Sequence, residues 1–156
     1  MSIPNFNLNG KVALVTGGSK GIGYGMAHAL GHYGATLIIS SRGAEEGEMA
    51  VLQLKKENIN AAYFPCDVTK KDQVNQLVSK IVEQYGSLDI LVNNAGMNIR
   101  KPLPDIEESD WDTVLEVNLK GIFIVGQAAA KQMMKQKYGK IINISSILGS
   151  IGMPFQ

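Results

Sequence analysis

The sequence predicts a doubly wound α/β fold, in which a parallel sheet lies between two layers of helices. Short apolar runs rich in β-branched residues alternate with longer amphipathic stretches along the 156 residues. The runs lack polar alternation, which is typical of parallel strands buried on both faces. Right-handed crossovers between such strands leave few topologies. At roughly 150 residues per domain, the length predicts one domain over residues 1–156.

Each expected element follows from this alternation. The five expected strands are Lys11–Thr16, Thr36–Ser40, Ala61–Pro65, Leu88–Val92 and Lys140–Ser145. The four expected helices are Gly21–Tyr33, Ala44–Glu57, Lys71–Tyr85 and Ser109–Gln136. Glycines that suit a left-handed helix end follow three of them, at Gly34, Gly86 and Gly139. The chain stops ten residues after Ser146, so we expect a sheet that ends before a sixth strand.

Composition narrows the classes of function. Fifteen Lys plus Arg against fourteen Asp plus Glu leave a net charge of +1, which argues against a nucleic-acid partner and against docking on an anionic membrane. One cysteine, Cys66, cannot form an internal disulfide. The first eleven residues do not read as a signal peptide, and no apolar run approaches the ~20 residues that span a bilayer. We therefore expect a cytoplasmic protein.

A glycine-rich turn, TGGSKGIG at residues 16–23, follows the first strand and opens the first helix. Glycines let the backbone turn sharply and let a pyrophosphate approach the helix N-terminus, where free N–H groups and the dipole favour negative charge. The spacing is TGxxxGxG, not GxGxxG, and no GK[ST] ending indicates a triphosphate-binding P-loop. A glycine-rich turn without a ligand is the alternative.

Four further motifs follow in order. They are Cys66-Asp67-Val68, Asn93-Asn94-Ala95-Gly96, Val117-Asn118-Leu119 and Asn143-Ile144-Ser145-Ser146. With the glycine turn, they make the sequence resemble the short-chain dehydrogenase/reductase family over almost its whole length, with a fainter resemblance to the gluconate 5-dehydrogenase-like subgroup. The resemblance implies a Rossmann fold with five strands in the order 3-2-1-4-5 and helices on both faces.

The resemblance also implies a nicotinamide cofactor site. Its diphosphate would lie against the turn at Gly17, Ser19, Lys20, Gly21, Ile22 and Gly23. Its adenine would lie at Asp67 and Val68, and its ribose and nicotinamide along Asn94, Ala95 and Gly96. All of these residues follow strand ends, where open α/β sheets bind ligands. The alternative for Asn93 and Asn94 is structural, with side-chain amides that tie neighbouring strand ends together.

The choice of cofactor follows from charge. A carboxylate after the second strand would bind the ribose 2′-hydroxyl and repel a 2′-phosphate. This sequence has Ser40-Ser41-Arg42 there and no acid before Glu45. Arg42 can make a forked contact with a phosphate, and Lys20 adds a second cation. NADP(H) is therefore favoured, unless Arg42 and Lys20 are ordinary solvated charges.

The implied reaction is hydride transfer between nicotinamide and a carbonyl or alcohol carbon, with a substrate of the sugar-acid, polyol or 3-oxoacyl class. Ser146 matches the family's serine that polarises the carbonyl, and Asn118 matches an asparagine of its proton relay. The family's Tyr-x-x-x-Lys pair is absent, because none of the five tyrosines is followed four residues later by lysine. We therefore expect the 156-residue chain alone to be inactive or impaired.

The sequence also allows other interpretations. A non-catalytic nucleotide-binding or self-associating protein would explain the missing pair. Methyltransferases that use S-adenosylmethionine share the fold. They usually have an acidic residue at the end of the second strand, where this sequence has Ser40-Ser41-Arg42. His28 and His32 are spaced for a metal but lack a third ligand, so no metal is expected. The family resemblance implies a homo-oligomer, a dimer or tetramer formed through the fourth helix or the last strand.

Overall fold

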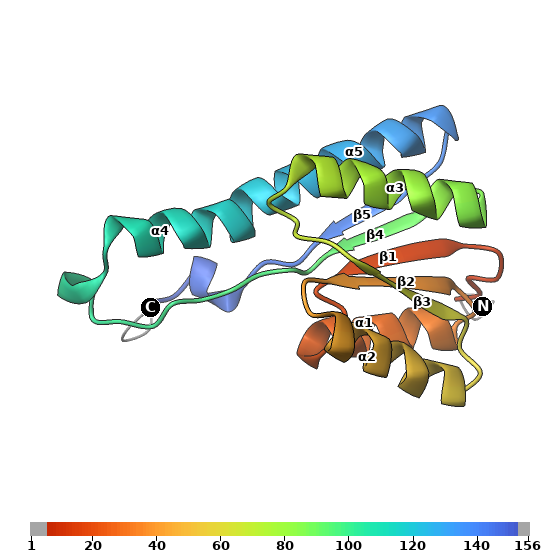
Figure 1. The fold of residues 1–156 in the computed structure, drawn as a ribbon, viewed down its shortest axis with the longest axis horizontal. Helices are drawn as coiled ribbons and strands as arrows, with labels where there is room; N and C mark the ends of the chain where they lie inside the picture. Colours follow the sequence, from red (N-terminus) through yellow and green to blue (C-terminus); the bar gives the residue numbers. More distant parts are fainter. Residues whose placement is uncertain (1–5, 153–156) are drawn as a thin grey trace, which may run out of the picture.

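The computed structural model describes residues 6–152. Five parallel strands form one sheet in the order β3-β2-β1-β4-β5 (Figure 1), which confirms the predicted fold. The strands are β1 Val12–Thr16, β2 Thr36–Ser41, β3 Ala61–Pro65, β4 Ile90–Asn93 and β5 Lys140–Asn143. Order and direction place all five carboxyl ends at one edge of the sheet, where ligands of such folds bind.

Helices cover both faces of this sheet (Figure 1). On one face lie α1 Gly21–His32 and α2 Ala44–Lys56, and on the other lie α3 Lys71–Tyr85 and α5 Ile122–Lys135. A further helix is α4 Glu108–Leu115, and η1 Leu103–Asp105 and η3 Ile147–Gly149 are short 3₁₀ turns. Within residues 6–152, no helix is long and apolar enough to cross a membrane.

The two layers make two separate apolar cores. Alternate residues of β1 point to opposite faces, so that Leu14 packs in the core under α3 and α5, whereas Val15 packs in the core under α1 and α2. Both residues are fully buried. Because the central strands β1, β2 and β4 are buried on both sides, their sequences are continuous apolar runs in place of alternation.

The predicted helix Ser109–Gln136 is helical without a break over Glu108–Lys135, but it is not α-helical throughout. The structure divides this stretch into α4, a π-helical segment η2 Glu116–Gly121, and α5. The segment η2 includes Asn118, whose amide bonds the backbone of Met97 in the loop after β4. A π segment inserts an extra residue into the helical turn and is frequent at functional sites.

Two of the three predicted glycine helix ends are confirmed. Gly34 and Gly86 have φ of 97° and 84°, which is the left-handed region that glycine adopts without strain. Gly139 is different, since the left-handed residue there is Lys137, with φ of 56°. A Cβ on Gly139 would lie 2.2 Å from Cγ of Met133, so this glycine makes room for a core side chain.

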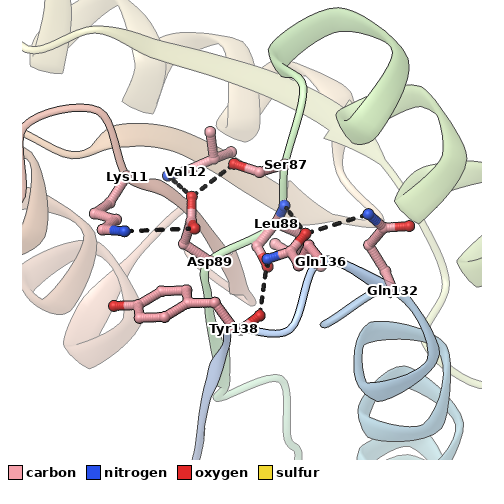
Figure 2. A network of polar contacts seen from close by, with 8 residues as sticks. All are labelled: Lys11, Val12, Ser87, Leu88, Asp89, Gln132, Gln136 and Tyr138. Atoms are coloured by element: carbon pink, nitrogen blue, oxygen red, sulfur yellow. Dashed lines mark hydrogen bonds and ion pairs between the residues drawn. The ribbon is translucent and has the colours of Figure 1, made fainter. Parts of the chain in front are cut away.

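At the amino ends of the strands, a polar network joins three strand starts (Figure 2). Asp89 Oδ2, which is buried, accepts hydrogen bonds from Val12 N at 2.9 Å and from Ser87 Oγ at 2.7 Å. Gln136 Nε2 donates to the carbonyls of Leu88 and Tyr138, both at 2.9 Å. We call this group the Asp89 network; it fixes how β1, β4 and β5 begin, on the side opposite the candidate site.

Candidate functional site

A cleft of about 470 Å³ lies at the carboxyl edge of the sheet, between the loops that follow β1 to β4. Every predicted cofactor residue except Gly21 lines it. The lining comprises Gly17, Ser19, Lys20, Ile22, Gly23, Ser40, Ser41, Arg42, Gly43, Glu46, Cys66, Asp67, Val68, Asn94, Ala95, Gly96 and Val117. Residues from four separate loops therefore meet at one site, as the strand-end argument predicts.

The glycine turn has a conformation that side chains would prevent. Gly17 has φ of 64°, and Gly21, the first residue of α1, has φ of 57°. A Cβ on Gly23 would lie 2.3 Å from the carbonyl oxygen of Gly17 and 2.4 Å from Nδ2 of Asn94. Only glycine lets α1 begin so close to the turn, which brings the amino end of a helix, with its unpaired N–H groups, to the cleft.

Thr16 and Asn94 hold the turn against the loop after β4. Asn94 Nδ2 donates to the carbonyls of Thr16 at 3.0 Å and Gly17 at 3.2 Å. Thr16 Oγ1, which is buried, accepts from the backbone N–H groups of Asn94 and Ala95, both at 3.1 Å. The Asn94 side chain thus ties neighbouring strand ends together, and the residue also lines the cleft. Asn93 has the same kind of role, since its Nδ2 donates to Asn143 Oδ1 at 2.9 Å.

The loop after β3 presents a fixed carboxylate. Asp67 Oδ1 accepts from the backbone N–H and the hydroxyl of Thr69, at 3.0 and 2.8 Å. Burial alone would raise the pKa of Asp67, but the two Thr69 bonds, together with the charges of Arg42 and Lys70, outweigh burial and hold that pKa below its usual range. Asp67 is therefore an ionised acceptor at neutral pH.

Cys66 lies beside Asp67 and is buried. Burial, with the negative charge of Asp67 adding to it, raises the pKa of the Cys66 thiol to about 11. The thiol therefore stays protonated at neutral pH and contributes wall surface to the cleft, not a nucleophile.

The two predicted cations lie in the cleft, and one has a partner that the sequence did not indicate. Lys20 Nζ forms an ion pair with Glu46 Oε1 at 3.1 Å. Arg42 is close enough to Asp67 to lower the pKa of that carboxyl. The sequence does not mark Glu46 as a site residue, because the predicted site residues follow strand ends, whereas Glu46 lies in the first turn of α2.

Ser40 is a second residue that the sequence did not assign to the site. Within the part of the chain that the structure describes, its hydroxyl is the one buried side-chain polar atom without a hydrogen-bond partner. Ser40 lines the cleft at the end of β2, and its carbonyl accepts from Gly17 N at 2.7 Å. An unpaired buried hydroxyl costs stability unless a ligand or water completes it.

The two predicted catalytic residues do not line the cleft. Asn118 Oδ1 accepts from Met97 N, and its Nδ2 donates to the Met97 carbonyl, both at 2.8 Å. Ser146 is exposed before η3, and its hydroxyl accepts from Leu148 N at 3.2 Å. Across residues 6–152, no group of three or more His, Cys, Asp or Glu side chains could hold a metal ion.

The sequence profile of the short chain dehydrogenase family matches residues 11–156. This chain belongs to that family. It is 42% identical over 147 residues to the 5-keto-D-gluconate 5-reductase of Escherichia coli K12, which covers 94% of this chain and 58% of that protein. The chain thus spans less than two thirds of the length of this relative.

Solved structures agree with the fold. A gluconate 5-dehydrogenase from Burkholderia cenocepacia, in complex with NADP and tartrate, is 37% identical with a TM-score of 0.90, over 97% of this chain and 59% of that one. An NAD+-bound xylitol dehydrogenase is 35% identical with a TM-score of 0.91, over 95% of this chain and 57% of that one. Members of similar fold thus hold either dinucleotide.

Proposed function

We propose that this chain forms the cofactor-binding part of an NADPH-dependent oxidoreductase that transfers hydride between nicotinamide and a carbonyl or alcohol carbon. The observation that carries the proposal is the cleft, where a glycine turn at a helix N-terminus lies beside Lys20 and Arg42. Since relatives of similar fold hold NADP or NAD+, the side chains after β2 must select the cofactor. No carboxylate ends that strand here, which favours the 2′-phosphate.

The residues present fit this cofactor. Gly17 and Gly23 leave open backbone where a Cβ would clash, which suits close approach of a diphosphate. Lys20 and Arg42 supply cationic donors for the 2′-phosphate. The unpaired hydroxyl of Ser40 is a further group that a ligand in the cleft could complete.

The chemistry follows from the same assignment. When bound, the cofactor supplies or accepts the hydride. We assign the Ser146 hydroxyl to polarise the substrate carbonyl by donating its O–H to the carbonyl oxygen, which it can do while its own oxygen accepts from Leu148 N. Asn118 is assigned as a positioning residue, because its amide holds the loop after β4 at Met97. The five tyrosines here supply no Tyr-x-x-x-Lys pair, so we expect the 156-residue chain to bind cofactor without turnover.

A sugar acid is the substrate class that we propose, with a polyol or a 3-oxoacyl compound as the alternatives. The support is the identity to a 5-keto-D-gluconate 5-reductase and the similarity to a gluconate 5-dehydrogenase. We also propose a homo-oligomer, since Trp111, Leu119 and Phe123 leave a large apolar surface exposed along α4, η2 and α5. Light scattering that shows only monomer at high concentration would contradict the oligomer.

Calorimetric titration with NADPH and NADH tests the cofactor assignment. We expect NADPH to bind more tightly, and Arg42→Ala to weaken NADPH by roughly 10- to 100-fold while NADH changes little, as for loss of a charge-assisted contact. Lys80→Ala is the matched control, because Lys80 is an exposed cation on α3 outside the cleft. Failure of both nucleotides to bind would overturn the proposal.

A further inference from the structure

Glu46 is an anion that lines the cleft and pairs with Lys20, one of the two cations assigned to the 2′-phosphate. Resting on the proposed function, we propose that Glu46 is a specificity-determining residue of this cleft. Its carboxylate holds the Lys20 ammonium in the free protein and competes for it with the 2′-phosphate. Glu46 thereby lowers the preference for NADPH over NADH.

The contacts place the carboxylate where this competition occurs. Glu46 Oε1 lies 3.1 Å from Lys20 Nζ, and both residues line the cleft. A Cβ added to Gly43 would lie 3.7 Å from Glu46 Oε2. The carboxylate therefore reaches from α2 back to Gly43, the residue that follows Arg42, and lies beside Lys20 in the cleft that Arg42 also lines.

The pair is weak enough for a ligand to displace. The side chains of Lys20 and Glu46 are 75% and 56% exposed, and exposed pairs contribute at most about 1 kcal/mol. A phosphate monoester carries about two negative charges at neutral pH and accepts stronger hydrogen bonds than one carboxylate. The displaced Glu46 carboxylate then remains in the same cleft as the phosphate, where like charges repel.

NADH makes no such demand. Its ribose carries a neutral hydroxyl in place of the 2′-phosphate, so Lys20 can keep Glu46 while NADH is bound. Displacing Glu46, and the repulsion that follows, therefore weaken the binding of NADPH and leave the binding of NADH unchanged. Removing the Glu46 charge should tighten the binding of one nucleotide and leave that of the other unchanged.

Glu46→Gln tests this, with Glu45→Gln as the matched control. Both acids lie in the first turn of α2, so both variants lose one charge and the same helix-dipole interaction. Glu45, however, does not line the cleft. By calorimetry at low salt, we expect Glu46→Gln to tighten NADPH by roughly 3- to 10-fold and NADH by less than about 2-fold. Glu45→Gln should shift either nucleotide by less than about 2-fold.

A double variant locates the effect at Lys20. In a Lys20→Ala background, the gain from Glu46→Gln should shrink, because the cation for which the two anions compete is gone. Equal effects of Glu46→Gln and Glu45→Gln, or equal tightening of NADPH and NADH, would overturn the inference while the cofactor assignment stands. If the unchanged protein binds neither nucleotide, both the assignment and this inference are wrong.

Discussion

Gly23→Ala tests whether the tight approach of α1 to the glycine turn makes the binding site. The added Cβ would lie 2.3 Å from the Gly17 carbonyl oxygen and 2.4 Å from Asn94 Nδ2. Neither neighbour can move freely, because Asn94 Nδ2 donates to that same carbonyl at 3.2 Å. The substitution must therefore push α1 away from the turn or break the bond that holds the turn.

The magnitude follows from a comparison with Gly25, two residues along the same helix. A Cβ on Gly25 would meet nothing within 4 Å, so Gly25→Ala should stabilise the fold by about 0.5–1 kcal/mol through helix propensity alone. Gly23→Ala gains the same propensity but adds overpacking, which costs about 1–3 kcal/mol. The difference between the two variants is the steric cost, and each kcal/mol corresponds to roughly 2–4 °C in Tm for a chain of this size.

Thermal unfolding and NADPH titration of both variants supply the measurements. We expect Gly23→Ala to have a lower Tm than Gly25→Ala and to bind NADPH at least roughly tenfold more weakly, since a shift of about 1 Å at the site removes contacts. Gly25→Ala should bind like the unchanged protein. Equal Tm values and equal affinities for the two variants would refute the argument.

Three further predictions concern stability and reactivity. Asp89→Ala leaves buried donors unpaired and should cost about 2–4 kcal/mol in chemical denaturation, whereas exposed Asp72→Ala should cost less than about 1 kcal/mol; equal losses would contradict the role of the Asp89 network. Burial and the charge of Asp67 raise the pKa of the Cys66 thiol to about 11, so the thiol should not react with a thiol reagent at pH 8 until the protein unfolds. Rapid labelling of the folded protein would refute this. A hydrogen bond from Lys101 lowers the pKa of Asp110 in the folded protein. The ionised Asp110 therefore stabilises the fold above the unfolded pKa of about 3.9, and this stabilisation is lost as pH falls through the folded pKa. Asp110→Asn should therefore be less stable than the unchanged protein at pH 7 but not at pH 2, and a pH-independent difference would count against it.

The strands and the cofactor edge could be predicted because their causes are local. Burial on both faces marks the central strands β1, β2 and β4 in the sequence itself. Each cleft loop directly follows a strand, so the positions of Asp67 and Asn94 agree with the roles that the family resemblance implies for them.

What the sequence did not indicate depends on contacts between distant residues. The stretch 116–121 has helical character, and nothing local marks the π segment whose Asn118 bonds Met97, 21 residues away. The partner of Lys20 is 26 residues away, inside α2. Gly139 has the pattern of a helix end, but its reason is the space that Met133 needs.

The bonds between Thr16 and Asn94 join the ends of β1 and β4, so the glycine turn and the loop after β4 behave as one rigid wall of the cleft. The Lys20–Glu46 pair, by contrast, consists of two exposed side chains on long stems. A nucleotide entering this cleft therefore meets a backbone that is already shaped and charges that are still to be rearranged. Association should then be fast and sensitive to salt, with side-chain exchange in place of loop closure as the step that completes binding.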